Sequence, residues 1–323
     1  MNRRALLQGL AASLALGPGA VLAQRGGPAR IGWLSYLADP DPALGLLREG
    51  LTKLGHVEGK SYVMLARYAN NDFTRVPALI DELVAEHIDV LVSRGPSVDF
   101  MKRMRDRIPV VFAYSGDPIA AGFADSLGKP GRNMTGMTFM AMELCAKRVE
   151  VLKELLPGAR RIALLSNPEH AGELLEYRVT EDSARRVGAE VTRYLVHAPR
   201  ELAPAFAAIR TAKSDAALIF PDSLTLNRRK EIAELAAANR IPCMYGWTEF
   251  AEAGGLMSYG PTITEGFRAL AVFTDKILKG GDASTIPIEQ ARSISLTLNM
   301  SAAKELGIKM SPALLARADR LIE

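Results

Sequence analysis

Apolar positions along this chain alternate between short continuous runs and stretches with helical spacing. The first run, 31–36, ends at the Asp-Pro-Asp-Pro stretch of 39–42 and predicts a buried strand. Apolar residues from Ala43 to Leu54 then recur at helical spacing and stop at Gly55, which predicts a helix. The same patterns predict strands at 62–68, 88–92 and 109–114 and helices at 76–84 and 96–107.

The second half of the chain repeats this order. Strands are expected at 161–166, 191–196, 215–220 and 241–245, and helices at 173–187 and 199–212. In each half a strand headed by aspartate, Asp89 or Asp215, precedes across one helix a strand headed by Ile-Pro, at 108–109 or 241–242. The repetition predicts two similar α/β lobes.

Alternating strands and helices fix the fold class that we expect. Each lobe should be a doubly wound parallel sheet covered by helices on both faces. Ligands of such sheets bind beyond the carboxyl ends of the strands. Two lobes that face each other enclose a cleft, and closing it over a small molecule is the expected mechanical use.

The N-terminal segment 1–23 has the features of a secretory signal peptide. Arg3 and Arg4 precede an apolar stretch, 6–16, and the small-residue pattern that ends at Ala23 places Gln24 first in the mature chain. The run 2–8 also resembles a twin-arginine export signal, so the sequence leaves both export routes open. We expect the mature protein in the periplasm.

Composition excludes several classes of protein. The 323 residues are 48% hydrophobic and 24% charged, which is typical of a globular protein. The net charge of +4 comes from interspersed charges and implies no nucleic-acid partner. No apolar run beyond the N-terminus reaches the roughly 20 residues of a membrane span, so the protein is not expected to be membrane-embedded.

Cysteines and histidines give no sign of a metal site or a cofactor. Cys145 and Cys243 are too few for a four-thiolate zinc site, and the four histidines show no paired spacing. We interpret the two cysteines as buried free thiols, with one disulfide as the alternative. The histidines are expected in helices, at helix ends or on loops away from the strand ends.

Several stretches are similar to one known family. They are Leu-Gly-His-Val-Glu-Gly-Lys at 54–60, Asp-Pro-Ile at 117–119, Ser-Leu-Gly-Lys-Pro-Gly-Arg-Asn-Met-Thr-Gly at 126–136, Leu-Lys-Glu-Leu-Leu-Pro at 152–157, Gly-Gly-Leu-Met-Ser-Tyr-Gly at 254–260, and the tail from 277–280 to 315–319. In order and spacing the chain resembles the ABC-transporter substrate-binding proteins that include tryptophan- and tyrosine-binding members.

The resemblance implies a type I periplasmic-binding fold with a three-segment hinge. The N-terminal lobe would hold 30–138 plus 262–290, and the C-terminal lobe 139–261 plus 291–323. Gly136 and Gly260 would serve the hinge, because glycine tolerates unusual backbone angles. The resemblance also implies delivery of a small molecule to an ABC permease with a separate ATPase subunit, and it implies no catalysis and no cofactor.

Residues that directly follow the predicted strands are the candidates for ligand binding. They are Ser35, Tyr36, Ser93, Arg94, Gly95, Ser97, Tyr114, Ser115 and Asp117 in the first lobe, and Asn167, Asp222, Ser223, Tyr245, Trp247 and Tyr259 in the second lobe or by the hinge.

The Ser93–Ser97 loop carries the sharpest hypothesis. Pro96 suits the first position of a helix whose free N–H groups form an anion site. Arg94 would add a planar donor for a carboxylate. Members of the family usually carry a small residue at this place, so Arg94 indicates either an acidic ligand or a departure from amino-acid specificity. A surface arginine beside the cleft is the alternative.

Aromatic and acidic candidates also have two interpretations. Tyr36, Tyr114, Trp247 and Tyr259 could enclose a planar ligand, whereas Trp33, in mid-strand, is expected in the core. Asp117 and Asp222 either pair with a ligand amine or cap a turn and a helix.

These observations predict the periplasmic solute-binding component of an ABC importer, capturing a small carboxylate that is an aromatic acid or an amino acid. A periplasmic ligand-sensing domain for a signalling partner is the alternative. An enzyme is disfavoured because the sequence has neither a Gly-x-Ser-x-Gly nucleophile elbow nor a Walker A loop.

Overall fold

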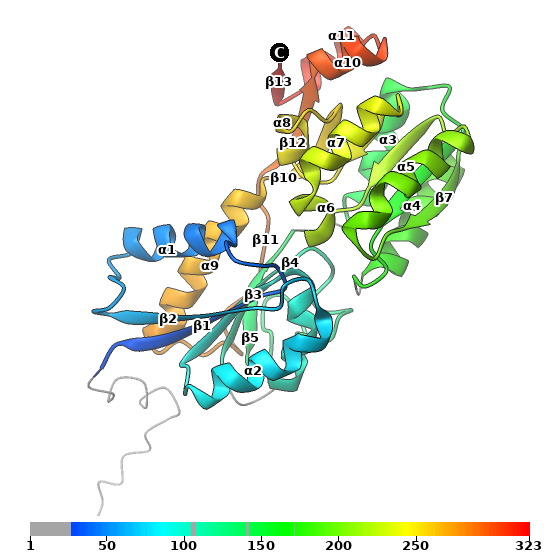
Figure 1. Cartoon of the computed structure of the whole chain (residues 1–323). Coiled ribbons are helices and arrows are strands. Elements are labelled where there is room, and N and C mark those ends of the chain that lie inside the picture. Colours follow the sequence, from blue (N-terminus) through cyan, green and yellow to red (C-terminus); the bar gives the residue numbers. More distant parts are fainter. Residues whose placement is uncertain (1–26, 105–107, 140–141, 171) are drawn as a thin grey trace, which may run out of the picture.

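The computed structural model describes residues 27–104, 108–139, 142–170 and 172–323 and shows two α/β lobes, one above the other in Figure 1. The predicted signal peptide, 1–23, lies outside the described residues. The expected fold class is confirmed: two doubly wound lobes of the same design are linked by three crossing segments. No helix in the described part of the chain has the length and apolar character needed to cross a bilayer.

The N-terminal lobe is built on a six-stranded parallel sheet with the order β2-β1-β3-β4-β5-β11. Its strands are β1 (Ala29–Ser35), β2 (Tyr62–Tyr68), β3 (Val90–Arg94), β4 (Val110–Tyr114), β5 (Met134–Thr138) and β11 (Glu289–Gln290). Its helices are α1 (Pro42–Lys53), the 3-10 turn η3 (Phe73–Arg75), α2 (Val76–Ala85), the 3-10 helix η4 (Gly95–Met104) and α9 (Ile263–Leu278).

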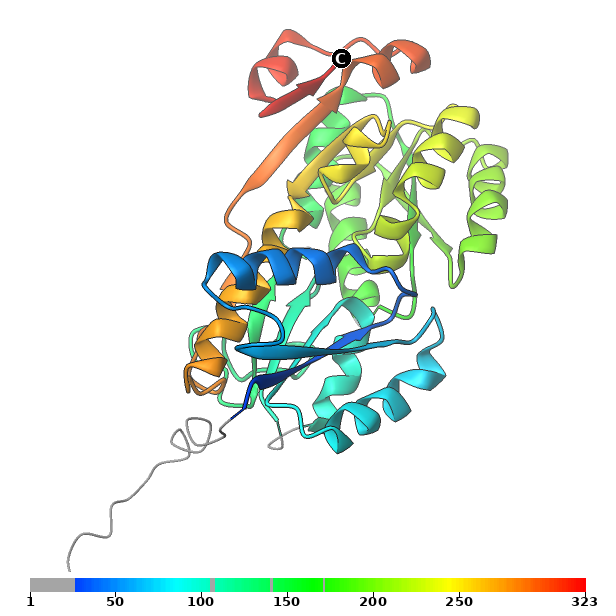
Figure 2. The ribbon, with the colours of Figure 1, turned by 60° about the vertical axis from the view of Figure 1, so that its left-hand side comes forward.

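Alternation along β1 explains how this sheet is covered. Ile31 and Trp33 are buried against α1 and α9, whereas Leu34 is buried against α2 and η4 on the other face. Figure 2 shows α1 lying across α9. The expected core position of Trp33 is therefore confirmed.

The C-terminal lobe has a seven-stranded sheet with the order β7-β6-β8-β9-β10-β12-β13. Its strands are β6 (Arg161–Ser166), β7 (Glu190–Leu195), β8 (Ala216–Ile219), β9 (Cys243–Tyr245), β10 (Met257–Pro261), β12 (Ile294–Asn299) and β13 (Arg320–Ile322); β12 runs antiparallel to β10. Its helices are α3 (Cys145–Leu155), α4 (Glu173–Arg186), η5 (Pro199–Glu201), α5 (Leu202–Thr211), α6 (Ser223–Asn227), α7 (Arg229–Ala238), α8 (Glu249–Glu252), α10 (Met300–Leu306) and α11 (Pro312–Arg317).

The repeated sequence pattern corresponds to a repeated set of hydrogen bonds. Asp89 accepts the backbone N–H of Arg30 at 2.7 Å, and Asp215 accepts that of Arg161 at 2.8 Å, so each aspartate fixes the start of a neighbouring strand. The carbonyls of Pro109 and Pro242 also accept equivalent strand N–H groups, each at 2.9 Å. The two lobes therefore begin their strands in the same way.

The chain crosses between the lobes after β5, between β10 and α9, and between β11 and β12. Gly136 and Gly260 lie inside β5 and β10 rather than at these crossings. A Cβ atom at Gly136 would stand 2.0 Å from the carbonyl oxygen of Phe112, and one at Gly260 would stand 1.9 Å from that of Gly246. These glycines permit close packing of the backbone inside the two strands. The hinge role expected for them stays a prediction.

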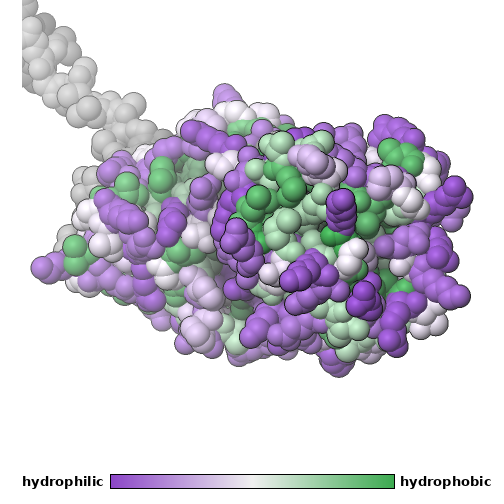
Figure 3. Space-filling view, turned by 90° about the horizontal axis from the view of Figure 1, so that it is seen from above, coloured by the Kyte–Doolittle hydropathy of each residue, from purple (hydrophilic) through white to green (hydrophobic). Residues whose placement is uncertain are grey.

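The remaining features of the fold are ordinary for a globular protein. The face seen in Figure 3 carries hydrophilic residues interspersed with hydrophobic ones. Cys145, at the start of α3, and Cys243, in β9, are both buried thiols outside any disulfide, as the preferred interpretation predicted.

Candidate functional site

The carboxyl ends of the two sheets face each other and bring together loops that are far apart in the sequence (Figure 1). A small cavity between the lobes is lined from the N-terminal lobe by Arg94, Gly95, Ala113, Ser115, Phe139, Ile263 and Phe267 and from the C-terminal lobe by Asp222, Ser223, Leu226 and Trp247. Its volume of about 20 Å³ holds about one water molecule. The lobes must therefore separate before a small molecule can enter.

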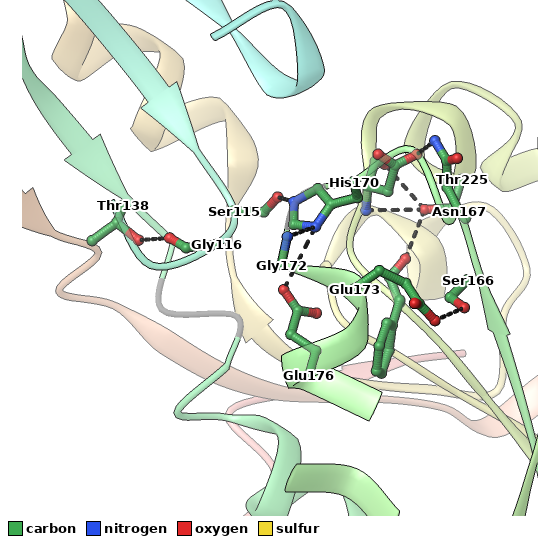
Figure 4. A network of polar contacts seen from close by, with 12 residues as sticks. Ser115, Gly116, Thr138, Ser166, Asn167, His170, Gly172, Glu173, Glu176 and Thr225 are labelled. Carbon is green, nitrogen blue, oxygen red and sulfur yellow. Dashed lines mark hydrogen bonds and ion pairs between the residues drawn. The ribbon is translucent and has the colours of Figure 1, made fainter. Parts of the chain in front are cut away.

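Several hydrogen bonds link the two lobes directly, and the one beside the cavity joins Ser115 to His170. Ser115 follows β4 and His170 lies in the loop after β6, and their Oγ and Nε2 atoms are 2.6 Å apart (Figure 4). The N–H of Gly172 donates to His170 Nδ1 at 3.2 Å, so Nδ1 is an acceptor and the proton is on Nε2, which donates to Ser115. Burial lowers the pKa of His170, which keeps the ring neutral.

A second close approach between the lobes occurs at Gly95 and Ser223. Gly95 has a positive φ of 58°, and a Cβ atom placed there would stand 2.1 Å from Ser223 Oγ. Gly95 therefore serves both a left-handed turn and the contact of the lobes.

Aromatic rings form one wall of the cavity. Trp247 and Phe139 meet edge to face with their ring centroids 4.9 Å apart, and Phe267 lies 6.2 Å from Phe139. Arg94 sits over the Phe267 ring at 4.9 Å. Such a wall suits a planar or apolar part of a ligand.

Arg94 has a different role from the one expected of it. Its Nε and Nη2 atoms donate to the two carboxylate oxygens of Asp41 at 3.2 and 2.9 Å, and Arg94 is only 4% exposed. Asp41 also accepts Ser35 Oγ at 2.6 Å and the N–H of Ala43, so it caps α1 as well. Because the guanidinium fork is bound to Asp41, it is not an open donor for a ligand carboxylate.

Two residues of the cavity wall carry polar atoms without a hydrogen-bond partner in the described structure. They are the carboxylate oxygen Oδ2 of Asp222 and the indole Nε1 of Trp247. Ser97 Oγ, two residues beyond Gly95, is also buried and unpartnered. Buried polar groups are nearly always hydrogen-bonded, so a set of open ones in a cleft indicates a ligand that completes them.

Both acidic candidates, Asp117 and Asp222, cap an element. Of the two, Asp222 also has a buried carboxylate oxygen without a hydrogen-bond partner in the described structure. Asp222 Oδ1 accepts the N–H of Leu224 at 2.6 Å and the side-chain amide of Asn167 at 3.2 Å, and it begins α6 with a capping box. Asp117 accepts the N–H of Ile119 at 2.8 Å, which caps a turn on the cleft rim. The capping alternative therefore holds for both aspartates.

The other predicted residues lie at differing distances from the cleft. Ser93 Oγ donates to the carbonyl of Leu34 within the sheet. Tyr245 is fully buried and stacks on Phe250, and Tyr259 packs against the C-terminal core, so neither lines the cavity.

Tyr36 lies beside the cleft, stacked on Phe73 with its hydroxyl donated to the carbonyl of Asn71. Burial, together with the carboxylates of Asp222, Glu169 and Asp72, raises the pKa of Tyr36 to about 12.

His170 belongs to a polar cluster that sequence reasoning missed (Figure 4). Ser166 donates to Glu173 at 2.7 Å, Arg193 reaches the other oxygen of Glu173 at 3.3 Å, and Glu176 lies one turn further along α4. The sequence offered one signal for His170, which is its position four residues after the end of β6, where strand-end residues enter the cleft. The expectation that the histidines lie away from the strand ends is wrong for His170.

Comparison with known proteins agrees with this architecture. A family model described as "ABC transporter substrate binding protein" matches residues 41–322. A curated relative, the "Tyrosine-binding protein" of Clostridioides difficile strain R20291, is 22% identical over 277 residues, which are 83% of this chain and 78% of the relative.

Two solved structures are also similar. An ABC domain from Streptococcus pneumoniae in complex with L-Trp has a TM-score of 0.82 and 23% identity over 92% of this chain and all of its own. A conserved domain protein from Vibrio cholerae has a TM-score of 0.83 and 25% identity over 91% of this chain and 99% of its own.

Proposed function

Because the chain belongs to the ABC transporter substrate-binding protein family, we propose that it is the exported solute-binding component of an ABC importer, and that its solute is a small aromatic α-amino acid. In this proposal the lobes, with the boundaries 30–138 plus 262–290 and 139–261 plus 291–323, close over the ligand. The closed form then docks on the permease in the membrane, which works with a separate ATPase subunit. The proposed location is the periplasm, after removal of the signal peptide 1–23.

The open polar atoms around the cavity carry the proposal. On the cavity wall, Trp247 Nε1 is a donor that needs an acceptor and Asp222 Oδ2 is an acceptor that needs a donor. The Ser97 hydroxyl, two residues beyond the wall residue Gly95, can donate or accept. A ligand with both a carboxylate and an ammonium group supplies both kinds of partner. A simple carboxylic acid would leave the Asp222 oxygen buried and unpaired, which is unfavourable.

The walls of the cavity support an aromatic side chain on that amino acid. Phe139, Trp247 and Phe267 offer apolar ring surface next to the polar atoms. The two lobes contribute groups of different kinds, so a ligand gains its full set of contacts only when they close, and this differential affinity is what drives closure. The relatives named for tyrosine and for bound L-Trp are consistent with this ligand class.

Calorimetric titration of the mature chain with L-tryptophan and L-tyrosine tests the proposal. Tryptamine and indole-3-acetate, which each lack one charged group of tryptophan, should bind at least tenfold more weakly than the amino acid. Asp222→Asn keeps the helix cap through Oδ1 and should weaken the amino acid by about 10–100-fold, in the range of a lost charge-assisted hydrogen bond.

The matched control is Asp282→Asn, because Asp282 Oδ1 likewise accepts a turn N–H, from Ser284, on the exposed surface. This variant should bind like the wild type. Indole-3-acetate binding as tightly as tryptophan would contradict the amino-acid assignment, and so would an unaffected Asp222→Asn variant. The importer role would be contradicted if deletion of the gene left uptake of the bound amino acid unchanged.

A further inference from the structure

A second cavity lies between the lobes, next to the first and larger than it. Its volume is about 270 Å³, and its wall includes Lys102, Tyr114 and Asp117 from the N-terminal lobe and Leu175 and Glu176 from the C-terminal lobe. Tyr114 lines this cavity whereas the next residue, Ser115, lines the first. His170 stacks on Tyr114 with ring centroids 5.5 Å apart and bonds to Ser115, so it stands where the two cavities meet.

Two buried oxygen atoms of this wall have no hydrogen-bond partner in the described part of the chain. They are the Tyr114 hydroxyl and Glu176 Oε1, on residues that are 1% and 2% exposed. His170 Nδ1 lies 3.9 Å from Glu176 Oε1, which is too far for a hydrogen bond, and it already accepts the N–H of Gly172. One atom comes from each lobe, so a single donor group could bridge them.

Once Glu176 is ionised, the charge of the cavity favours a cation. Asp117 and Glu176 contribute carboxyl groups, and the only cationic side chain that lines the described cavity is that of Lys102. The Lys102 ammonium lies 3.8 Å from Asp99 and over the ring of Phe123, so it is already bound to its own lobe. A metal ion is a poor occupant, because no group of three metal-ligating side chains occurs among the described residues.

We propose that this second cavity binds the ammonium group of a small organic amine, with Glu176 Oε1 and the Tyr114 oxygen as its acceptors. The bound ammonium joins the two lobes beside the His170–Ser115 bond and stabilises the closed form. The inference is separate from the amino-acid site proposed above, whose ammonium partner is Asp222.

The protonation of Glu176 makes the site sensitive to pH. Burial, opposed by Arg148 and reinforced by the carboxylates of Asp222, Glu173 and Glu143, raises the pKa of Glu176 to about 8. The adjoining His170 is neutral, and Tyr114 has a raised pKa from burial and from Asp99, Glu176 and Asp117. An ammonium ion binds the ionised carboxylate, so binding must release a proton from Glu176 below pH 8.

Titration with ethylammonium, followed by NMR at pH 6.5 and pH 8.5 without any amino acid, tests the site. The affinity should be about 25-fold higher at pH 8.5, because Glu176 is then mostly ionised. Glu176→Gln should abolish both the binding and its pH dependence, and Tyr114→Phe should weaken binding several-fold. Glu181→Gln, at a partly exposed position of the same helix outside the cavity wall, is the matched control and should not change the binding of ethylammonium.

The outcomes separate this inference from the proposed function. No ethylammonium binding, binding that Glu176→Gln leaves intact, or equal binding of ethanol would overturn it. If Glu176→Gln weakens L-tryptophan and ethylammonium by the same factor, the ammonium of the amino acid itself lies at Glu176, and a separate amine site is overturned. If it weakens only ethylammonium, the site is supported and takes a separate amine. If L-tryptophan fails to bind, the proposed function is contradicted, whereas the test of the ammonium site with ethylammonium is unaffected.

Discussion

The two lobes share a topology but treat buried charge at the cleft in opposite ways. In the N-terminal lobe, Arg94 and Asp41 satisfy each other completely and also involve Ser35 and the start of α1. In the C-terminal lobe, Asp222 and Glu176 each keep one buried oxygen without a hydrogen-bond partner in the described structure. The Arg94–Asp41 pair is therefore part of the scaffold of its own lobe, whereas the two carboxylates of the C-terminal edge present acceptors to a molecule that enters the cleft.

The difference shows why equivalent positions in a repeated fold do not have equivalent functions. The repeat conserves the strand starts, where Asp89 and Asp215 accept the same kind of backbone N–H. The strand ends have no such common pattern. A charge at a strand end is a ligand contact only if its own lobe leaves it open, and this depends on neighbours that are distant in sequence.

Removal of Arg94 should have the largest effect on stability. Arg94→Ala leaves the Asp41 carboxylate buried without its main partner, and breaking a buried pair in this way costs about 3–5 kcal/mol. Chemical denaturation of the mature chain measures the change in the free energy of unfolding. The control is Arg48→Ala, because Arg48 makes the same two-pronged contact with Glu58 on the surface, at 3.0 and 3.2 Å.

The surface variant should lose less than about 1 kcal/mol. A stable Arg94→Ala variant that has lost only ligand affinity would break the comparison, since Arg94 would then belong to the binding site rather than to the scaffold.

Sequence reasoning was sufficient for the fold because its signals are local. Each strand and helix has its own apolar pattern, and the Asp and Ile-Pro strand starts repeat along the chain. Parallel sheets then follow from the alternation of elements. The 3-10 form of η4 was not predicted, because its apolar spacing resembles that of a helix starting at Pro96.

The candidate site was only partly predictable, because it depends on contacts between distant segments. The strand-end rule located Gly95, Ser115, Asp222, Ser223 and Trp247 on the cavity wall. Arg94 and its partner Asp41 are 53 residues apart in the sequence, and Ser115 and His170 are 55 apart. No local sequence pattern predicts either contact. Tyr245 was misplaced because alternate residues at a strand end point to opposite faces, and its neighbours on the sheet decide which face is buried.

On the C-terminal side of the cleft, the charge of a buried group should destabilise the folded chain, whereas the charged Arg94–Asp41 pair stabilises it. The pKa of Glu176 is raised to about 8 by burial, so the folded chain holds this proton up to a higher pH than the unfolded chain does. The stability that this provides is complete below about pH 4.5 and is lost as the pH rises through 8, by on the order of 3 kcal/mol.

Glu176→Gln cannot ionise, so its stability should fall less between pH 5 and pH 9 than that of the wild type. Denaturation curves at both pH values give the difference, and Glu181→Gln should behave like the wild type. Equal pH dependence in the wild type and Glu176→Gln would mean that the Glu176 carboxylate is already satisfied, and the contrast between the lobes would then disappear.

The smallest effect is expected where the two lobes touch at Gly95 and Ser223. Gly95→Ala places a Cβ atom against Ser223 Oγ only when the lobes are closed, and overpacking of this kind costs about 1–3 kcal/mol. The variant should shift the equilibrium toward the open form by about 5- to 100-fold, which the distance between one spin label on each lobe would report.

Gly59→Ala is the matched control, because Gly59 also has a positive φ, of 82°, but its added Cβ would meet nothing within 4 Å. Adding Ser223→Ala to Gly95→Ala removes the obstructing oxygen and should restore part of the closed population. If the double variant is as open as Gly95→Ala alone, the contact with Ser223 Oγ is not what separates the lobes, because a left-handed backbone that penalises alanine equally in both forms would not shift the equilibrium between them.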